Sequence, residues 1–284
     1  MTLLLDPRQR AMLAEMGVRT DFLPAVPSDA VAARAPAEVA PASAQRVDTL
    51  ATAATPPAPS TTLAQAQPMV SQDTTAVSEL SWEALEQSVR ACQACGLCKT
   101  RKNTVFGVGA PAAGPGLAPR ADWLIVGEAP GENEDLQGEP FVGQAGRLLD
   151  NMLKAMGLSR RAQGAPEASV YILNVLKCRP PGNRNPQPEE LLQCAPFLER
   201  QVALLQPKII VAMGRFAVQS LLKDTVPQVE SIPLGKLRGQ IYSYRGIPVV
   251  VTYHPAYLLR SLAEKAKAWA DLCLALSRAR RPQD

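Results

Sequence analysis

The chain has 284 residues, with 30 Lys and Arg against 26 Asp and Glu, six cysteines and one histidine. No stretch approaches the ~20 apolar residues of a membrane helix, and Met1–Asp6 lacks the basic region of a signal peptide, so we expect a cytoplasmic protein without a membrane segment. Residues 1–80 carry a net charge of −3 and residues 81–284 a net charge of +7. A basic globular part is compatible with a nucleic-acid partner. Cysteines in a reducing compartment indicate metal binding or catalysis before disulfides.

The first 80 residues differ from the rest of the chain. Residues 1–22 contain a predicted short amphipathic helix over 6–17, because Met12, Leu13 and Met16 fall on one face. Residues 23–80 are rich in Ala and Pro and cannot bury enough apolar surface to fold, so we expect a disordered linker. We hypothesise that 1–22 is a docking peptide for a protein partner or for the domain itself; a tail without a role is the alternative.

The globular domain is expected over 81–284. Strands and helices are predicted to alternate along it, which favours a mostly parallel, four-stranded sheet covered by helices on both faces. The predicted strands are 122–127, 170–175, 208–214 and 248–253. The predicted helices start near 82, after 141, at 188–205, at 215–223 and at 257–280, and a hairpin is expected at 238–245.

Chemically informative residues follow the predicted strands. In parallel sheets, sites lie beyond the carboxyl ends of the strands. The first strand ends at Gly127 and is followed by a Glu- and Gly-rich loop, the second ends at Asn174, and the third at Gly214. The fourth ends at His254, the single histidine, just before a proline. Because a histidine at such a position is well placed for chemistry, we interpret it as functional.

Four cysteines form two distant groups. Cys92 and Cys95 are spaced as Cys-x-x-Cys, while Cys178 and Cys194 bracket a proline-rich loop. Such thiolate sets hold iron–sulfur clusters or structural zinc. Cys98 extends the first group into a ferredoxin-like run; we expect it to be a bystander, although it could replace one of the four.

Four motifs together resemble the family 4 uracil-DNA glycosylases. They are Gly127-Glu128-Ala129-Pro130-Gly131, Gly138-Glu139-Pro140-Phe141-Val142-Gly143, Asn174 with Lys177-Cys178-Arg179-Pro180-Pro181, and His254-Pro255-Ala256-Tyr257-Leu258-Leu259-Arg260. The match runs from about Cys92 to Arg260. The resemblance implies a three-layer α/β/α domain, a DNA-repair glycosylase that flips uracil out of DNA and leaves an abasic site, and a 4Fe-4S cluster on Cys92, Cys95, Cys178 and Cys194.

The resemblance also assigns roles in the pocket. Phe141 stacks on the flipped base, Asn174 reads its edge, and His254 hydrogen-bonds the O2 atom on which negative charge develops. Gly127 and Ala129 belong to the substrate pocket, and Ala129 stands where better-known uracil-DNA glycosylases have an Asp. The water-activating carboxylate is therefore open: Glu134, expected in the loop after Gly131, is our first candidate and Glu128 the second.

DNA contacts are expected around the pocket. Leu258 or Leu259 is a candidate wedge for the gap left by the flipped base, or both pack inward. Candidates for phosphate contacts are Arg260, Arg179, Arg184, Lys177 and Lys99 or Arg101. We expect the cluster to be structural, because hydrolytic base release moves no electrons, and we expect a monomer.

We compare three other interpretations of these residues. A covalent mechanism through a histidine in the loop 181–186 is rejected, since that loop has none. A redox carrier leaves the strand-end motifs unexplained. A non-catalytic DNA-binding module associated with a DNA polymerase is the main alternative.

Overall fold

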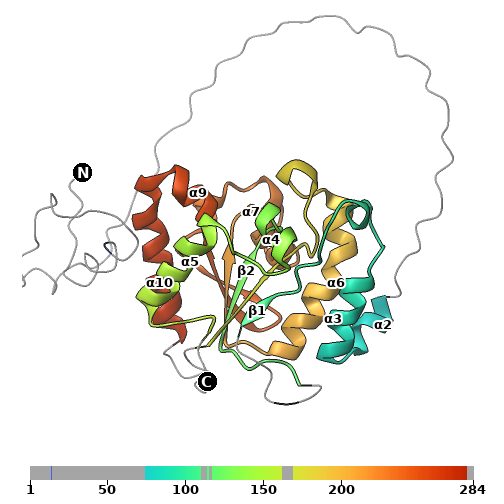
Figure 1. Cartoon of the computed structure of the whole chain (residues 1–284). Helices are drawn as coiled ribbons and strands as arrows, with labels where there is room; N and C mark the ends of the chain where they lie inside the picture. The colour runs from blue at the N-terminus through green and yellow to red at the C-terminus, as the bar shows by residue number, and fades with distance from the viewer. Residues whose placement is uncertain (1–13, 15–73, 110–113, 115–116, 162–168, 280–284) are drawn as a thin grey trace, which may run out of the picture.

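The computed structural model describes residue 14 and residues 74–109, 114, 117–161 and 169–279. The described part is a mixed α/β domain around one six-stranded sheet of order β1-β3-β2-β4-β6-β5 (Figure 1). The strands are β1 (Val108–Gly109), β2 (Trp123–Gly127), β3 (Val170–Asn174), β4 (Ile209–Met213), β5 (Ile241–Tyr244) and β6 (Ile247–Thr252). The central four pair in parallel, whereas β1 is antiparallel to β3 and β5 to β6. The four parallel strands were predicted; the expected strand number was wrong, because an antiparallel strand lies at each edge.

Helices cover both faces of this sheet, as expected. The helices are α2 (Thr74–Glu79), α3 (Trp82–Ala91), α4 (Glu132–Gln137), α5 (Gln144–Met156), α6 (Pro188–Leu205), α7 (Arg215–Leu222), α8 (Leu234–Leu237), α9 (Pro255–Arg260) and α10 (Lys265–Ala279). Short 3₁₀ turns are η2 (Gly96–Lys99), η4 (Pro181–Asn183), η5 (Val229–Ser231) and η6 (Leu262–Glu264). One apolar core joins the sheet to α3, α6 and α7, and the other joins it to α5 and α10. Figure 1 shows these two helical layers on opposite sides of the strands.

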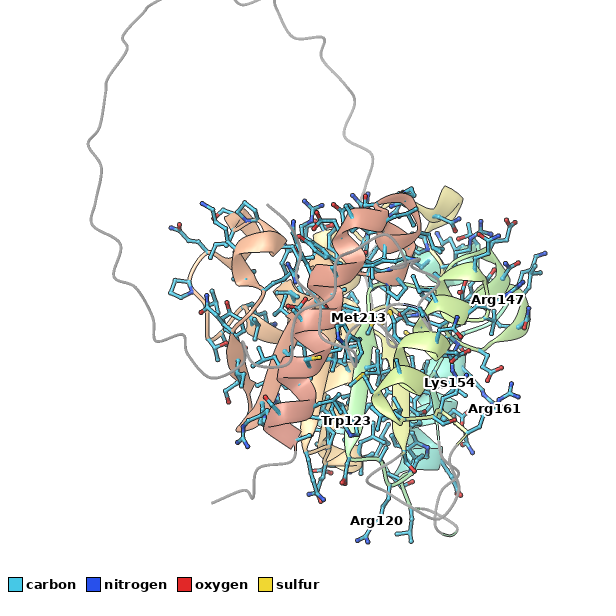
Figure 2. All side chains as sticks on the ribbon, turned by 90° about the vertical axis from the view of Figure 1, so that its left-hand side faces the viewer. Arg120, Trp123, Arg147, Lys154, Arg161 and Met213 are labelled. Carbon is cyan, nitrogen blue, oxygen red and sulfur yellow. The ribbon has the colours of Figure 1, made fainter. Side chains whose placement is uncertain are left out.

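The alternation of strand side chains divides the two cores. In β2 all five residues are buried, and Leu124 contributes to one core while Trp123 and Ile125 contribute to the other. Figure 2 shows Trp123, the first residue of β2, toward one end of the sheet and Met213, the last residue of β4, toward the other. The carboxyl ends of the parallel strands therefore share one edge, where a site is expected.

Helix boundaries test the sequence predictions closely. Helix α6 has the predicted bounds, with Pro188 at its first position, where a missing N–H costs nothing. The single helix predicted over 257–280 was wrong. It is divided into α9, η6 and α10, because Ser261 leaves the helical region at φ −125° and ψ 73°.

Two expectations about the N-terminal part concern residues that the structure largely does not describe. The docking peptide 1–22, apart from residue 14, and the linker as far as residue 73 lie outside them. Helix α2 falls in residues that the sequence assigned to the linker, and its Val77 is buried against the domain. Among the described helices, none is both long and apolar enough to cross a membrane.

Candidate active site

A cleft of about 930 Å³ lies at the carboxyl ends of β2, β3, β4 and β6. Its floor and rim combine residues that are far apart in the sequence. Among the residues that line it are Glu128, Ala129, Glu134, Phe141, Asn174, Arg184, His254 and Arg260, all of them named from the sequence.

Gly127 sets the spacing between the aromatic ring and the amide. It is the partner of Asn174 in the register of β2 and β3. A Cβ atom at this position would collide with Asn174 Oδ1 and would lie 2.7 Å from Phe141 Cζ. Only a residue without a side chain lets the ring and the amide approach across the strand end.

Phe141 is held in an unusual backbone conformation. Its φ is +56°, a value that non-glycine residues rarely adopt and that is typically enforced at functional sites. Arg160, which is buried, donates from Nη1 to the carbonyl of Pro140 at 2.9 Å. A Cβ at Gly146 would overlap the Phe141 carbonyl. These contacts fix the backbone that carries the Phe141 ring.

Asn174 brings a buried polar atom to the cleft. Its Oδ1 has no hydrogen-bond partner among the described residues, although a buried acceptor without a donor is costly. Its backbone is fixed by Lys177, whose buried ammonium donates to the Asn174 carbonyl at 2.7 Å. An acceptor that is held rigidly and left unpaired is suited to a donor supplied by a ligand.

His254 is oriented by the helix that follows it. Its Nδ1 accepts the N–H of Ala256 at 3.1 Å and caps α9, and its ring stacks with that of Phe141 at 5.4 Å between centroids. Burial and, to a smaller extent, the nearby charge of Arg260 together lower the pKa of His254 to about 4. The ring is therefore neutral at pH 7. Because Nδ1 is an acceptor, the proton is on Nε2, which makes that atom a donor.

The two candidate carboxylates have different surroundings. Glu134 was expected in a loop, but it lies on α4. Its Oε2 accepts the N–H of Gly131 at 3.1 Å. Glu128 accepts the N–H of Phe216 at 3.0 Å, at the start of α7, and burial raises its pKa. Gly214, at φ +94°, makes room for it, since a Cβ there would lie 2.6 Å from Glu128 Oε1. Glu128 therefore joins the first motif to α7.

The two leucines that follow His254 differ sharply. Leu258 is fully buried in the core with α5 and α10, so its predicted contact with DNA was wrong. Leu259 is 38% exposed. Of the two candidate wedges, Leu259 alone lies at the surface.

The candidate residues for phosphate contacts also differ in their exposure and in their hydrogen-bond partners. Arg260 is exposed at the cleft, whereas Lys177 is buried and its predicted contact with phosphate was wrong. Arg184 forms a bidentate pair with Glu190, at 2.9 and 2.5 Å. Arg179 donates to Asn183 at 2.7 Å. Arg101 donates to Cys178 Sγ at 3.1 Å.

Sequence reasoning missed Arg215 and Tyr257, which also line the cleft. Arg215 directly follows Gly214, so the strand-end rule that selected Gly214 would have found it. Tyr257 is 38% exposed and packs on Tyr253 at 5.0 Å between ring centroids. Arg215 adds positive charge to the rim, and Tyr257 adds aromatic surface.

A second, smaller cavity lies beside the cleft and is lined by Cys92, Cys95, Cys98, Cys178 and Cys194. Burial raises the pKa of Cys95, of Cys178 to about 11 and of Cys194 to about 12. Cationic and N–H donors face these sulfurs: Arg101 at Cys178, and the backbone of Lys177 at Cys194 at 3.4 Å. Within the described residues, no three His, Cys, Asp or Glu side chains are grouped closely enough to share a single metal ion.

Comparison with known proteins places this architecture in a family. Residues 115–273 match the model of the uracil DNA glycosylase superfamily. The chain is 43% identical over 180 residues to the type-4 uracil-DNA glycosylase of Saccharolobus solfataricus, covering 62% of this chain and 76% of the relative. It is 42% identical over 184 residues to that of Archaeoglobus fulgidus, covering 62% and 84%.

A more distant similarity is to a DNA polymerase of Bacillus phage SP01, at 27% identity over 141 residues, which cover 50% of this chain but 14% of the polymerase. The polymerase similarity is thus confined to a small part of a much longer protein. With the superfamily match over more than half of its length, and with relatives above 40% identity that it covers by three quarters or more, the chain belongs to the type-4 uracil-DNA glycosylases of the uracil DNA glycosylase superfamily.

Proposed function

We propose that this protein removes uracil from DNA by hydrolysing the N-glycosidic bond, leaving an abasic site. The observation that carries the proposal is the unpaired, buried Oδ1 of Asn174 in the cleft beside Phe141. Uracil presents an N3–H donor to such an acceptor and an O4 acceptor to the Asn174 amide. Cytosine inverts both groups, so it would leave the buried amide unpaired, which is strongly unfavourable.

The aromatic ring and the histidine supply the remaining recognition and chemistry. A base that is flipped out of the duplex stacks on Phe141. Bond cleavage leaves negative charge on uracil, in part on O2, and the Nε2–H of neutral His254 donates to that oxygen. A fixed donor of this kind, in a site from which water is excluded, contributes a few kcal/mol to the transition state.

We assign the water-positioning role to Glu134 rather than to Glu128. The attacking water and the cationic sugar call for an ionised carboxylate nearby. Both carboxylates line the cleft and each accepts a backbone N–H, Glu134 from Gly131 at the start of its own helix and Glu128 from the N-terminus of α7. They differ in that burial raises the pKa of Glu128. A raised pKa disfavours the ionised form, so Glu128 fits a structural role better.

Leu259 and three arginines complete the proposed contact with DNA. Leu259 is suited to fill the gap that the flipped base leaves. Arg260 and Arg215 are exposed at the cleft and Arg179 is partly buried; all three are suited to phosphate contacts, which position the enzyme without reading sequence.

We further propose that Cys92, Cys95, Cys178 and Cys194 hold a 4Fe-4S cluster. Five cysteines converge on one cavity, and four thiolates can hold either a structural zinc or an iron–sulfur cluster. The resemblance to the family 4 enzymes favours the cluster, and colour separates the two, since an iron–sulfur protein is brown and a zinc protein is colourless. The cluster would cross-link the α3–η2 segment to the loop after β3. Cys98 also lines the cavity, so its role as a bystander stays a prediction.

The test is strand cleavage, after alkali, at a single uracil in a labelled oligonucleotide, with brown, iron-containing protein. We expect cleavage at uracil but not at cytosine, and a loss of about 10³-fold in Asn174→Ala, since two hydrogen bonds to the base disappear. Asn185→Ala, an exposed cleft asparagine, is the matched control and should retain activity. Uracil-containing DNA that is bound but never cleaved would instead favour a non-catalytic DNA-binding module.

A further inference from the structure

Helix α4 lacks an apolar anchor. It has six residues, all of them described, and its only buried side chain is that of Asp135, which is 2% exposed. Its one leucine, Leu136, is 50% exposed. A helix this short has little stability of its own. Its position must therefore depend on polar contacts with other parts of the chain.

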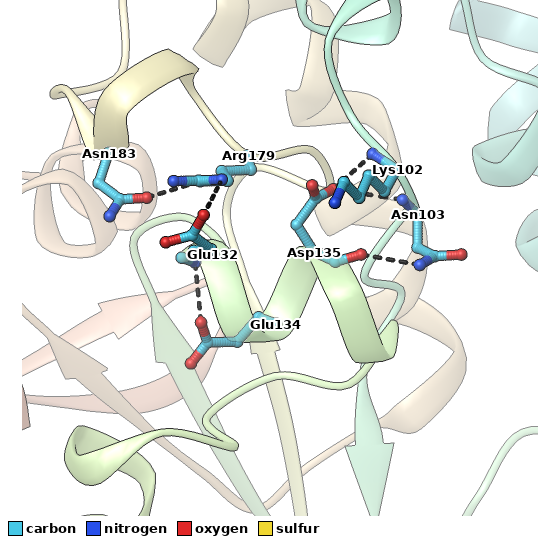
Figure 3. A network of polar contacts seen from close by, with 8 residues as sticks. Lys102, Asn103, Glu132, Glu134, Asp135, Arg179 and Asn183 are labelled. Atoms are coloured by element: carbon cyan, nitrogen blue, oxygen red, sulfur yellow. Dashed lines mark hydrogen bonds and ion pairs between the residues drawn. The ribbon is translucent and has the colours of Figure 1, made fainter.

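Asp135 makes the principal contact of this kind. Its Oδ1 accepts the backbone N–H groups of Lys102 at 2.9 Å and of Asn103 at 3.2 Å. In return, Asn103 Nδ2 donates to the carbonyls of Asp135 at 2.8 Å and Leu136 at 3.1 Å. Figure 3 shows Asp135 directed toward Lys102 and Asn103. The Asp135 carboxylate and the Asn103 side-chain amide thus each hydrogen-bond the backbone of the other segment, and together they hold α4 on residues 102–103.

The segment that Asp135 binds is also connected to both groups of cysteines. Lys102 lies four residues after Cys98 in the sequence. Its neighbour Arg101 donates to Cys178 Sγ at 3.1 Å and to the carbonyl of Arg90 at 3.0 Å. Four residues after Arg101, the Val105 N–H donates to the Lys177 carbonyl at 2.8 Å. Residues 101–105 are therefore hydrogen-bonded to the segments that carry both groups of cysteines.

The other side of α4 faces the cleft. Gly131 and Glu134 line the cleft and are hydrogen-bonded to each other. Helix α4 also forms an ion pair between Glu132 and Arg179 at 3.5 Å, and the Glu132 side chain is 66% exposed. Exposed pairs contribute little to position or stability. Figure 3 shows both contacts of α4. Because Asp135 is buried and Glu132 is exposed, we take Asp135 as the stronger of the two anchors.

We propose that Asp135 is a positioning residue that couples the cysteine segment to the active site, by fixing α4, and with it Gly131 and Glu134, on residues 102–103. The carboxylate does not touch the substrate; it acts through Glu134 and the Gly131 amide. A displacement of about 1 Å at such groups can lower a rate by about 10²-fold. The activity part of this inference rests on the proposed function.

The test compares iron-loaded Asp135→Ala, Asp135→Asn and Asn103→Ala with wild type. The control is Asp122→Ala, which removes a partly buried carboxylate paired with Lys208 at the opposite end of β2. We expect Asp135→Ala to lower kcat by about 10- to 100-fold while KM and iron content stay close to wild type. Asparagine retains the oxygen that accepts both N–H groups, so Asp135→Asn should recover most of kcat.

Hydrogen exchange in DNA-free protein gives a readout that does not depend on activity. Amides of 131–138 should exchange faster in Asp135→Ala, less so in Asp135→Asn, and as in wild type in Asp122→Ala. If Asp135→Ala does not fold, Asn103→Ala should show the same pattern with a smaller loss, since the carboxylate remains.

Unchanged kcat and unchanged exchange in Asp135→Ala and Asn103→Ala would overturn the proposal. Loss of iron in step with loss of activity would also overturn it, because Asp135 would then act by retaining the cluster. If the wild type itself releases no uracil, the proposed function fails, while the exchange pattern still decides the role of Asp135.

Discussion

The strand-end cleft and the cysteine cavity are neighbours that are built in different ways. Asn174 and Gly127 are register partners on central parallel strands, and His254 follows the last residues of β6. In contrast, Cys92 ends α3, Cys95 precedes η2, and Cys178 lies in the loop after β3. Among these cysteines, Cys194 alone lies within a helix, α6.

This difference indicates where each region obtains its rigidity. The hydrogen-bond ladder and the two apolar cores hold the cleft residues whether or not a ligand is present. Apart from α6, which carries Cys194, the cysteine segments are short and irregular, so their geometry should depend on the bound group, as is typical of metal sites whose ligands meet only in the folded protein. Asp135 lies at the junction of the two regions.

After Asn174→Ala, the largest effect is expected from substituting His254 in the cleft. His254→Ala should lower kcat by about 10²-fold, because the donor to the developing negative charge is lost. His254→Ser is the matched variant, since serine is a good N-cap and preserves the start of α9. Single-turnover rates should fall equally in both. Recovery of the rate in His254→Ser would mean that the histidine acts only as a cap.

Breaking the cysteine region should have a smaller effect on catalysis and a larger one on local structure. Cys178→Ser should lose iron and lower kcat/KM by about tenfold through displacement of α4. Hydrogen exchange should rise in 92–103 more than in β2 and β4. Cys273→Ser, on α10, is the control and should retain iron, as determined by metal analysis. Equal loosening of the sheet would contradict the contrast between the regions.

A substitution of Leu259 tests whether this exposed side chain at the rim contacts DNA. Leu259→Ala should lower kcat/KM a few-fold on double-stranded DNA and less on single-stranded DNA, where no gap needs filling. Its unfolding free energy should stay within about 0.5 kcal/mol of wild type. Leu258→Ala is the contrast and should cost about 2–5 kcal/mol, because Leu258 is fully buried. Urea unfolding and cleavage assays measure both.

The smallest expected effect is the absence of a titration. Because His254 is the single histidine, its ring proton resonance in tag-free protein can be assigned without ambiguity. With a pKa of about 4, the resonance should not shift between pH 7.5 and 5.5. An unfolded histidine titrates near 6.5, so the contribution of His254 to stability falls as pH decreases from about 6.5 to 4 and is constant outside that range. A midpoint near 6.5 would contradict a buried, neutral ring.

Local signals explain what could be predicted. Pro188 and the long amphipathic stretch before Pro207 define α6, and four apolar runs define the parallel strands. Glycine is accepted at an N-cap, and Glu134 three residues later accepts the Gly131 N–H, which is the Glu half of a capping box. This half was available in the sequence, although Glu134 was expected in a loop. The break at Ser261 has no such signal, since neither Gly nor Pro is present there.

By itself the sequence determined the kinds of groups that meet: an aromatic, an amide and an imidazole at strand ends, and two groups of cysteines. It could do so because strand period, strand-end position and ligand spacing are local properties of a chain. Only the tertiary structure decided that Leu258 is buried while Leu259 is exposed, that Lys177 holds Asn174 instead of phosphate, and that Asp135 binds residues 102–103. Those outcomes depend on packing and on backbone N–H groups more than 30 residues away, which no local pattern encodes.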